Sequence, residues 1–317
     1  MEFIESKEKE VLIITHISDI DGMGSAVLGN LIFPKLDVLL CGTDEVKNAL
    51  ETMILKEQNY KEIYMCDLSF PLDFIEKIEN TSLKNKFRHF DHHISGLSSS
   101  SYFWSTVIPE IDGFKPSGTS LFYEYLCSLD KYPILERQAI KEFVEAIRSY
   151  DTWTFEQDKN YTGRYLTDIF SMIGPLTFIS KYKEHLKQLE DKFELSDFDK
   201  ELVSIKEKEM ERYIEECDEN LIKTKFLDYN VGITISEQFR SSVGNKLSTK
   251  YKDILDFILI VDFHRRSFSM RTVNDVDLSI IAQSLGGGGH KKAAGFPMNE
   301  ENIDKIFPLL QKKLIKK

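Results

Sequence analysis

The N-terminal part of the chain alternates between short apolar runs and amphipathic stretches. The apolar runs predict buried strands, at 11–15, 37–41, 62–66 and 86–90. The stretches between them predict helices, at 22–33, at 43–58 with Thr43 as the N-cap, and from Pro71, which suits a first helical turn. Because strands alternate with helices, we expect a doubly wound, mainly parallel α/β sheet.

Downstream of residue 91 the pattern becomes mainly helical. A serine-rich loop at 97–101 and a strand at 102–108 precede helical patterns at 120–129 and 135–148, which continue to about residue 190. The highly charged segment 196–219 predicts a long connecting helix whose charges form a solvated face.

Strand patterns return after residue 225. Strands are predicted at 229–235, 255–263 and 267–272, helices at 244–251, 277–285 and 302–315, and a glycine loop at 286–289. We therefore expect a helical extension of the first sheet domain, then the long helix, and then a smaller C-terminal α/β domain.

Composition is that of a soluble globular protein, with 42% apolar and 29% charged residues. No run of 18 apolar residues occurs, so no membrane span is expected. The charged N-terminus does not resemble a secretory signal. The four scattered cysteines form no CxxC pair, which predicts reduced thiols and a cytoplasmic location.

The net charge of −11 bears on the class of partner. A protein that grips a long duplex uses many Lys and Arg contacts to the phosphates, which an acidic chain supplies only from a concentrated basic patch. A short oligonucleotide or a dinucleotide needs few cationic contacts, and bound divalent cations offset a carboxylate-rich site. The charge therefore favours a small anionic substrate.

Acidic and histidine side chains gather where predicted strands and helices end. They are His16, Asp19 and Asp21 after the first strand, Asp67 after the third, Asp91, His92 and His93 after the fourth, and Asp151 after a helix. In open α/β sheets, ligands bind at the carboxyl ends of the strands. Successive histidines can face one site only where the backbone turns, because adjacent side chains of a strand point to opposite faces.

These residue types suit a pair of metal ions. Asp and His are ligands expected for Mn²⁺. Asp19 and Asp21 can serve two ions from one loop, and Asp67 can bridge ions about 3.5–4 Å apart. Such a pair lowers the pKa of a bridging water and produces a hydroxide nucleophile. Each carboxylate alone is more typical of an N-cap or a loop, but their shared position favours a two-metal phosphoryl-transfer site.

The C-terminal glycine run carries a second set of candidate residues. Gly287, Gly288 and Gly289 permit close backbone approach to an anion, and His290 and Lys291 add side-chain donors. Arg271, on a preceding predicted strand, can reach the same place. A glycine run alone is more often a flexible loop, but with these cations it is better interpreted as a phosphate or nucleotide clamp.

These motifs occur in a characteristic order. The segment 16–22 (HISDIDG), Asp67, the triplet 91–93 (DHH) and Asp151 resemble the four motifs of the DHH phosphoesterase superfamily. The segments 287–290 (GGGH) and 293–296 (AAGF) resemble the glycine-rich motif of the DHH-associated C-terminal domain. The resemblance spans residues 11–296 and is strongest to small nano-RNase and oligoribonuclease-like phosphodiesterases.

The resemblance implies two Mn²⁺ ions, with Mg²⁺ or Co²⁺ as substitutes. One ion is held by His16, Asp19 and Asp67, and the other by Asp21, Asp67, His92 and Asp151. Asp91 orients a ligand histidine, and the catalytic His93 faces the substrate phosphate. The terminal phosphate or adjoining nucleotide is held by Arg271, Gly287, Gly288, Gly289, His290 and Lys291. Two residues separate His16 from Asp19 where many members have one or three, so His16 departs from the pattern.

The implied domains are a DHH catalytic metal-binding domain at 1–195, a connecting helix at 196–224 and a DHH-associated substrate-binding domain at 225–317. The substrate is expected in the cleft between the domains. The implied activity is Mn²⁺-dependent hydrolysis of short single-stranded RNA or dinucleotides to mononucleotides. Long duplexes and membranes are not expected as partners, and a homodimer is left open.

Other activities stay open at this point. One is removal of the 3′-phosphate from 3′-phosphoadenosine 5′-phosphate, and another is a cyclic mono- or dinucleotide-related phosphodiesterase. A family II inorganic pyrophosphatase resembles the same metal set but lacks the glycine-His motif. A non-catalytic nucleotide-binding protein is expected to have lost metal ligands, whereas here all four motifs keep their charged residues.

Overall fold

A computed structural model describes residues 1–5 and 10–314 of the chain. The chain divides into two compact units, Met1–Val203 and Ser204–Lys317. The long helix α8 (Asp197–Glu219) begins in the first unit and ends in the second. Among the described residues, no helix is both long and apolar enough to cross a membrane.

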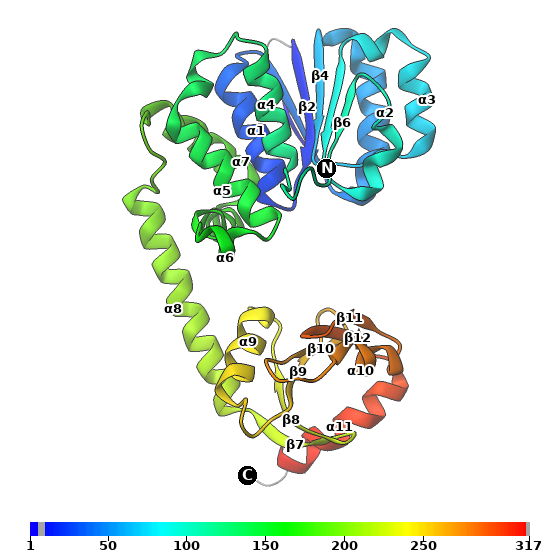
Figure 1. Ribbon diagram of the computed structural model, residues 1–317, viewed down its shortest axis with the longest axis vertical. Coiled ribbons are helices and arrows are strands. Elements are labelled where there is room, and N and C mark those ends of the chain that lie inside the picture. The colour runs from blue at the N-terminus through cyan, green and yellow to red at the C-terminus, as the bar shows by residue number, and fades with distance from the viewer. Residues whose placement is uncertain (6–9, 315–317) are drawn as a thin grey trace. The chain divides into compact units, whose positions relative to one another are not determined.

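The first unit is built on a six-stranded sheet in the order β1-β3-β2-β4-β5-β6 (Figure 1). The strands are β1 (Glu2–Ile4), β2 (Val11–His16), β3 (Leu36–Cys41), β4 (Glu62–Cys66), β5 (Phe87–Asp91) and β6 (Ser105–Val107). All neighbours pair in parallel except β1 with β3. This confirms the doubly wound, mainly parallel α/β class. Strand β1 was not predicted, because three residues are too few to show a periodic pattern.

Helices cover both faces of this sheet (Figure 1). One face packs against α1 (Ile20–Ile32), α4 (Gly118–Ser128), α5 (Gln138–Asp151) and α7 (Thr162–Gln188), and the other against α2 (Val46–Lys56) and α3 (Leu72–Glu79). The short helix α6 (Phe155–Asp158) follows α5. Because β2, β3 and β4 are covered on both faces, their sequences are mostly apolar, with the buried Asp37 as an exception in β3.

Two local predictions in the first unit differ from the structure. The predicted helix 43–58 consists of a 3₁₀ turn at Thr43–Glu45, then α2, then a second 3₁₀ turn at Glu57–Asn59. Thr43 is not the N-cap: Gly42 precedes the turn, and the Gly42 amide donates to the Glu45 carboxylate at 3.0 Å. Pro71 is the N-cap of α3 rather than its first residue.

The second unit has its own six-stranded sheet, in the order β11-β12-β10-β9-β8-β7. The strands are β7 (Ile222–Phe226), β8 (Tyr229–Ile235), β9 (Phe257–Asp262), β10 (Ser267–Arg271), β11 (Gly288–His290) and β12 (Ala293–Pro297). All pairs are antiparallel except β8 with β9. Helix α9 (Arg240–Lys250) covers one face, and α10 (Leu278–Ser284) and α11 (Glu300–Leu314) cover the other.

The glycine run is partly a strand rather than the predicted loop. Residues Gly288–His290 pair with β12 as an edge strand. A Cβ on Gly289 would lie 2.5 Å from the Cα of Ala294. The backbone φ of Gly289 is +139°, a value that residues with a side chain rarely adopt. Only glycine therefore lets β11 approach β12 this closely. The last residue of the predicted helix 302–315 lies outside the described residues.

Candidate metal centre

The predicted metal ligands of the first unit meet at the carboxyl edge of its sheet. His16 ends β2, Asp67 follows β4 directly, and His92 follows β5. Asp151 is the last residue of α5, which packs against the same sheet. Parallel strands bring their carboxyl ends to one edge, which explains why residues so distant in sequence come together.

Asp19 and Asp21 enter the site from the start of α1. Asp19 is the N-cap of α1, and its Oδ1 accepts a hydrogen bond from the Gly22 amide at 3.1 Å. Its Oδ2 lies 2.6 Å from Nδ1 of His16. The fully buried Asp21 carboxylate accepts the amides of Gly118 and Thr119, at 2.6 and 2.9 Å. These amides begin α4, whose positive end stabilises the buried charge.

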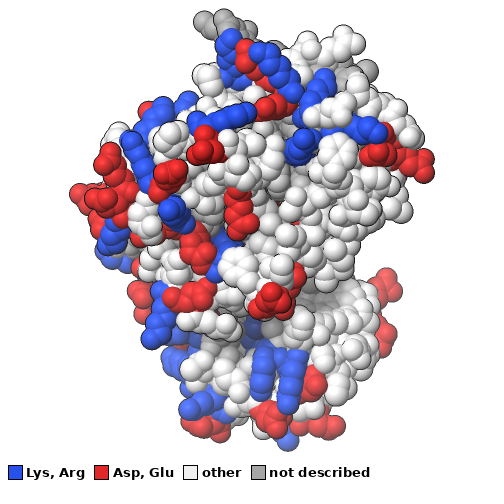
Figure 2. All heavy atoms as spheres, turned by 45° about the horizontal axis from the view of Figure 1, so that its top comes forward, with Lys and Arg blue, Asp and Glu red and all other residues white. Residues whose placement is uncertain are grey.

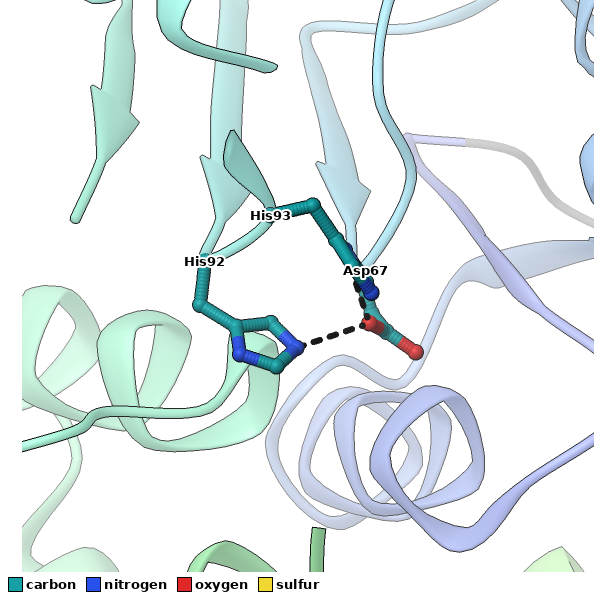
Figure 3. Close-up of side chains that lie close together, drawn as sticks. All are labelled: Asp67, His92 and His93. Atoms are coloured by element: carbon teal, nitrogen blue, oxygen red, sulfur yellow. Dashed lines mark ion pairs between the residues drawn. The ribbon is translucent and has the colours of Figure 1, made fainter. Parts of the chain in front are cut away.

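Asp67 lies at the centre of the cluster. Its Oδ1 is 3.5 Å from Nε2 of His92 and 3.8 Å from Nδ1 of His93, so both imidazoles approach the same carboxylate oxygen (Figure 3). Its Oδ2 is 3.7 Å from Nδ1 of His16. The same Nε2 of His92 lies 3.3 Å from Oδ2 of Asp151 and 3.9 Å from Oδ2 of Asp21.

These contacts define three sets of side chains that can each hold a cation. The sets are His16, Asp19 and Asp67; Asp21, His92 and Asp151; and Asp67, His92 and His93. The first two correspond to the two predicted ligand sets, except that Asp67 is absent from the second set. The third contains His93, which was predicted to face the substrate instead.

The donor atoms suit divalent cations. Asp67 Oδ2, His92 Nε2 and Asp151 Oδ2 are buried and have no hydrogen-bond partner within the described part of the chain. Burial and the neighbouring Asp21 raise the pKa of Asp67 well above its usual range and the pKa of Asp151 to about 8. Burying several carboxylates together is costly unless a cation compensates them. The residues therefore fit a metal centre.

Asp91 contacts the two histidines that follow it in different ways. Its Oδ1 accepts the backbone amides of His92 and His93, at 2.8 and 3.2 Å, and lies 2.7 Å from the ring Nδ1 of His93. Asp91 was predicted to orient a histidine that binds metal. It contacts the ring of His93, whereas in His92 it contacts only the backbone amide. Half of the His93 side chain, 49%, is exposed.

Replacing Asp151 with asparagine is expected to stabilise the metal-free protein at alkaline pH. The folded protein favours the protonated form of Asp151, because its folded-state pKa is raised to about 8. Protonated Asp151 therefore contributes fully to folding stability below the unfolded-state pKa near 4, and this contribution is lost as pH rises toward 8. In EDTA at pH 8, the variant is expected to gain about 1–2 kcal/mol, roughly 2–6 °C in Tm.

The pH dependence supplies the control for this prediction. At pH 5 in EDTA, Asp151 is protonated in the folded state and largely ionised in the unfolded state, because pH 5 lies between the two pKa values. Only a small part of the stability is lost at this pH, so the variant is expected to gain less stability at pH 5 than at pH 8. Thermal denaturation at both pH values measures the difference. A variant that is destabilised equally at pH 5 and pH 8 contradicts the assignment of a buried, uncompensated carboxylate.

The second unit places two predicted substrate residues on one sheet face. His290 pairs with Ala293, and Ala293 pairs with Arg271, so all three point to the same side of the sheet. The Arg271 guanidinium donates to Ser241 on the first turn of α9 at 3.3 Å. Lys291, by contrast, forms an ion pair with Asp275 at 2.7 Å, so its ammonium group already has an anionic partner.

The sequence did not point to Arg240, which joins this basic cluster. Arg240 begins α9, lies next to Ser241 and forms an ion pair with the buried Asp262 at 3.1 Å. Burial and the nearby Arg240 lower the pKa of Arg271. Two neighbouring guanidinium groups repel each other, and an anion between them removes that repulsion. An isolated arginine at a helix start carries no sequence signal for this role.

Charged side chains of both signs are interspersed over the face drawn in Figure 2, without a continuous basic field on that face. The basic cluster of the second unit consists of Arg240 and Arg271, with His290 on the same sheet face as Arg271. Such a cluster suits one or two phosphate groups.

Comparisons with known proteins give matches that include these four. Residues 235–316 match the DHHA1 domain family. Oligoribonuclease NrnB of Bacillus subtilis is 30% identical to this chain, and the match covers 90% of this chain and 72% of NrnB. An uncharacterized protein of Acanthamoeba polyphaga mimivirus, R106, is 24% identical, and the match covers 92% of this chain and 68% of R106. The solved pGpG-specific phosphodiesterase PggH of Vibrio cholerae shares the fold, with a TM-score of 0.56, 16% identity and coverage of 97% of this chain and 99% of that one.

Proposed function

Because this chain belongs to the DHH phosphoesterase superfamily and is a phosphodiester hydrolase, we propose that it hydrolyses short oligoribonucleotides and dinucleotides to mononucleotides with two Mn²⁺ ions. The convergence of unpartnered ligand atoms from Asp67, His92 and Asp151 supports the metal requirement. The 30% identity to an oligoribonuclease supports the substrate class. The proposed ligands are His16, Asp19 and Asp67 for one ion and Asp21, Asp67, His92 and Asp151 for the other.

When bound, the two ions supply Lewis acidity to the phosphate oxygens and to the attacking water. The protein holds their ligands in place: α4 amides fix Asp21, and the N-cap geometry fixes Asp19. Asp91 holds Nδ1 of His93, which leaves Nε2 as the ring nitrogen that faces the substrate. His93 then donates to a phosphoryl oxygen or assists the leaving group.

An exposed tryptophan lies close to the metal ligands in sequence. Trp153, two residues after Asp151, is 68% exposed and packs its ring edge-to-face on Phe155 at 5.2 Å. An exposed indole that is held from behind can stack on a nucleobase, which is worth about 1–3 kcal/mol per base. We propose that Trp153 stacks on a base of the bound dinucleotide.

Replacing Trp153 with alanine is expected to raise KM for a diribonucleotide by about 10-fold and to leave kcat within about 3-fold. Trp153→Phe keeps a π-face and should recover most of the affinity. Steady-state kinetics with Mn²⁺ measures both constants. If kcat falls while KM stays constant, Trp153 does not act as a binding surface for a base.

The basic cluster of the second unit is proposed to bind a terminal phosphate through Arg271, His290 and the amides of Gly288 and Gly289. The amide of Gly287 was also predicted to take part, but it already donates to the Ala282 carbonyl at 2.8 Å. Arg271→Ala is expected to raise KM for a 5′-phosphorylated dinucleotide by about 10-fold or more, because a charge-assisted contact is lost. The matched control is Arg265→Ala, an arginine in the turn after β9. An equal effect of both variants contradicts a specific role for Arg271.

A substrate panel tests the proposed function as a whole. It comprises RNA and DNA of two to ten nucleotides, a linear 5′-phosphorylated dinucleotide, a cyclic mononucleotide, a cyclic dinucleotide, 3′-phosphoadenosine 5′-phosphate and pyrophosphate. Turnover that is fastest with RNA of two to five nucleotides supports the proposal. A preference for pyrophosphate or for the phosphomonoester points to one of the other activities and contradicts it.

A further inference from the structure

The carboxylate of Asp91 is held at both oxygens. Oδ1 contacts Nδ1 of His93 at 2.7 Å, and Oδ2 accepts the hydroxyl of Ser69 at 2.8 Å. We propose that Ser69 is a positioning residue: it fixes the rotamer of Asp91 and, through Asp91, the direction in which His93 faces the substrate. The inference rests on the proposed function of His93.

The direction of the hydrogen bonds supports this arrangement. The Ser69 hydroxyl has one proton, and the ionised Asp91 can only accept it. The second contact of Ser69, to the Ser95 hydroxyl at 2.8 Å, is therefore one in which Ser95 donates. A one-way chain of donors runs from Ser95 through Ser69 to Asp91, and His93 donates to the other oxygen of the same carboxylate.

The lack of a side chain at Gly96 leaves room for the Asp91 carboxylate in this hydrogen-bonded arrangement. Asp91 is fully buried, and a Cβ on Gly96 would lie 2.4 Å from its Oδ2. Any side chain at residue 96 would therefore push the carboxylate off the position from which it bonds to Ser69. Ser69 itself lies two residues after Asp67, on the loop that leaves β4.

Ser69 is separate from the metal ligands in its hydrogen bonding. Among the residues that the structure describes, its hydroxyl bonds only to Asp91 and Ser95, and not to Asp67 or to the ring of His92. Loss of the hydroxyl should therefore loosen His93 and leave the metal centre intact. A partner outside the coordination sphere typically changes activity by about 10- to 100-fold when it is removed.

The test uses the full chain with Mn²⁺ and a diribonucleotide. Ser69→Ala is expected to lower kcat by about 10-fold while KM and the Mn²⁺ affinity stay within about 2-fold of wild type. Ser69→Thr, which keeps the hydroxyl, should recover kcat. Ser100→Ala is the matched control, since that hydroxyl donates to the Leu97 carbonyl instead of Asp91.

A double-mutant cycle isolates the path through His93. In a His93→Ala background, Ser69→Ala should have no further effect, because the residue that it positions is gone. Additive losses, or a loss of Mn²⁺ affinity in Ser69→Ala, overturn the proposal.

A spectroscopic readout separates this proposal from the proposed activity. In wild type, the ¹⁵Nδ1 and its proton in His93 should show a hydrogen-bonded resonance, and in Ser69→Ala this resonance should shift or broaden. If wild type fails to cleave any dinucleotide, the proposed function fails, and the His93 resonance still decides the role of Ser69. An unchanged resonance in Ser69→Ala overturns that role.

Discussion

Asp67→Asn is expected to lower kcat for a diribonucleotide by about 1000-fold or more and to abolish the stabilisation by Mn²⁺. Asp67 contacts His16 on one side and His92 and His93 on the other, so its charge serves both proposed ions. It has a positive φ of 56°, a conformation that asparagine also tolerates. The substitution therefore removes the charge with little strain on the fold.

A second buried carboxylate in the same sheet provides the control. Asp37 on β3 is fully buried and accepts the Tyr60 hydroxyl at 2.6 Å, away from the metal ligands. Asp37→Asn should lower Tm but keep the Mn²⁺ affinity and turnover. Isothermal titration with Mn²⁺ and steady-state kinetics compare the two variants. Mn²⁺ binding by Asp67→Asn at wild-type affinity contradicts the central position of this carboxylate.

Replacing His92 is expected to affect Mn²⁺ binding, whereas replacing His93 is expected to affect kcat. His92→Ala should lose Mn²⁺ binding, because its unpartnered Nε2 lies within 3.9 Å of Asp67, Asp151 and Asp21. His93→Ala should keep Mn²⁺ binding and lose about 100-fold or more in kcat, because its Nδ1 is already engaged by Asp91 and its ring is half exposed.

The same two measurements test this division of roles. The Mn²⁺-induced rise in Tm reports metal binding, and single-turnover kinetics at saturating Mn²⁺ reports the chemical step. His93 also belongs to one of the three cation-binding sets. If both variants lose the Tm rise equally, His93 is a metal ligand and the proposed substrate-facing role is wrong.

Much of the first unit could be predicted because its signals are local. The apolar runs of β2 to β5 and the ordered polar residues at their ends follow from hydrophobic patterning and the geometry of parallel sheets. His16 shows the limit of spacing arguments. Its separation from Asp19 departs from the family pattern, yet Nδ1 lies 2.6 Å from that carboxylate.

What the sequence could not predict depends on contacts between distant segments. The amides of Gly118 and Thr119 that hold Asp21 lie 97 and 98 residues away, and backbone donors have no side-chain signature. Ser69 lies 22 residues from Asp91, and a serine in a loop is unremarkable in composition. The strand β11 was missed because glycine is disfavoured in strands, and here only its lack of a side chain permits the pairing.

We propose that a metal centre built on His92 and Asp151 hydrolyses short RNA. The most direct test is Mn²⁺-dependent turnover of a diribonucleotide by wild type and by the His92→Ala/Asp151→Ala double variant, with circular dichroism to confirm that both are folded. We expect hydrolysis to mononucleotides by wild type, none in EDTA, and no detectable turnover by the double variant. Full activity of the folded double variant would show that His92 and Asp151 do not hold a catalytic metal ion.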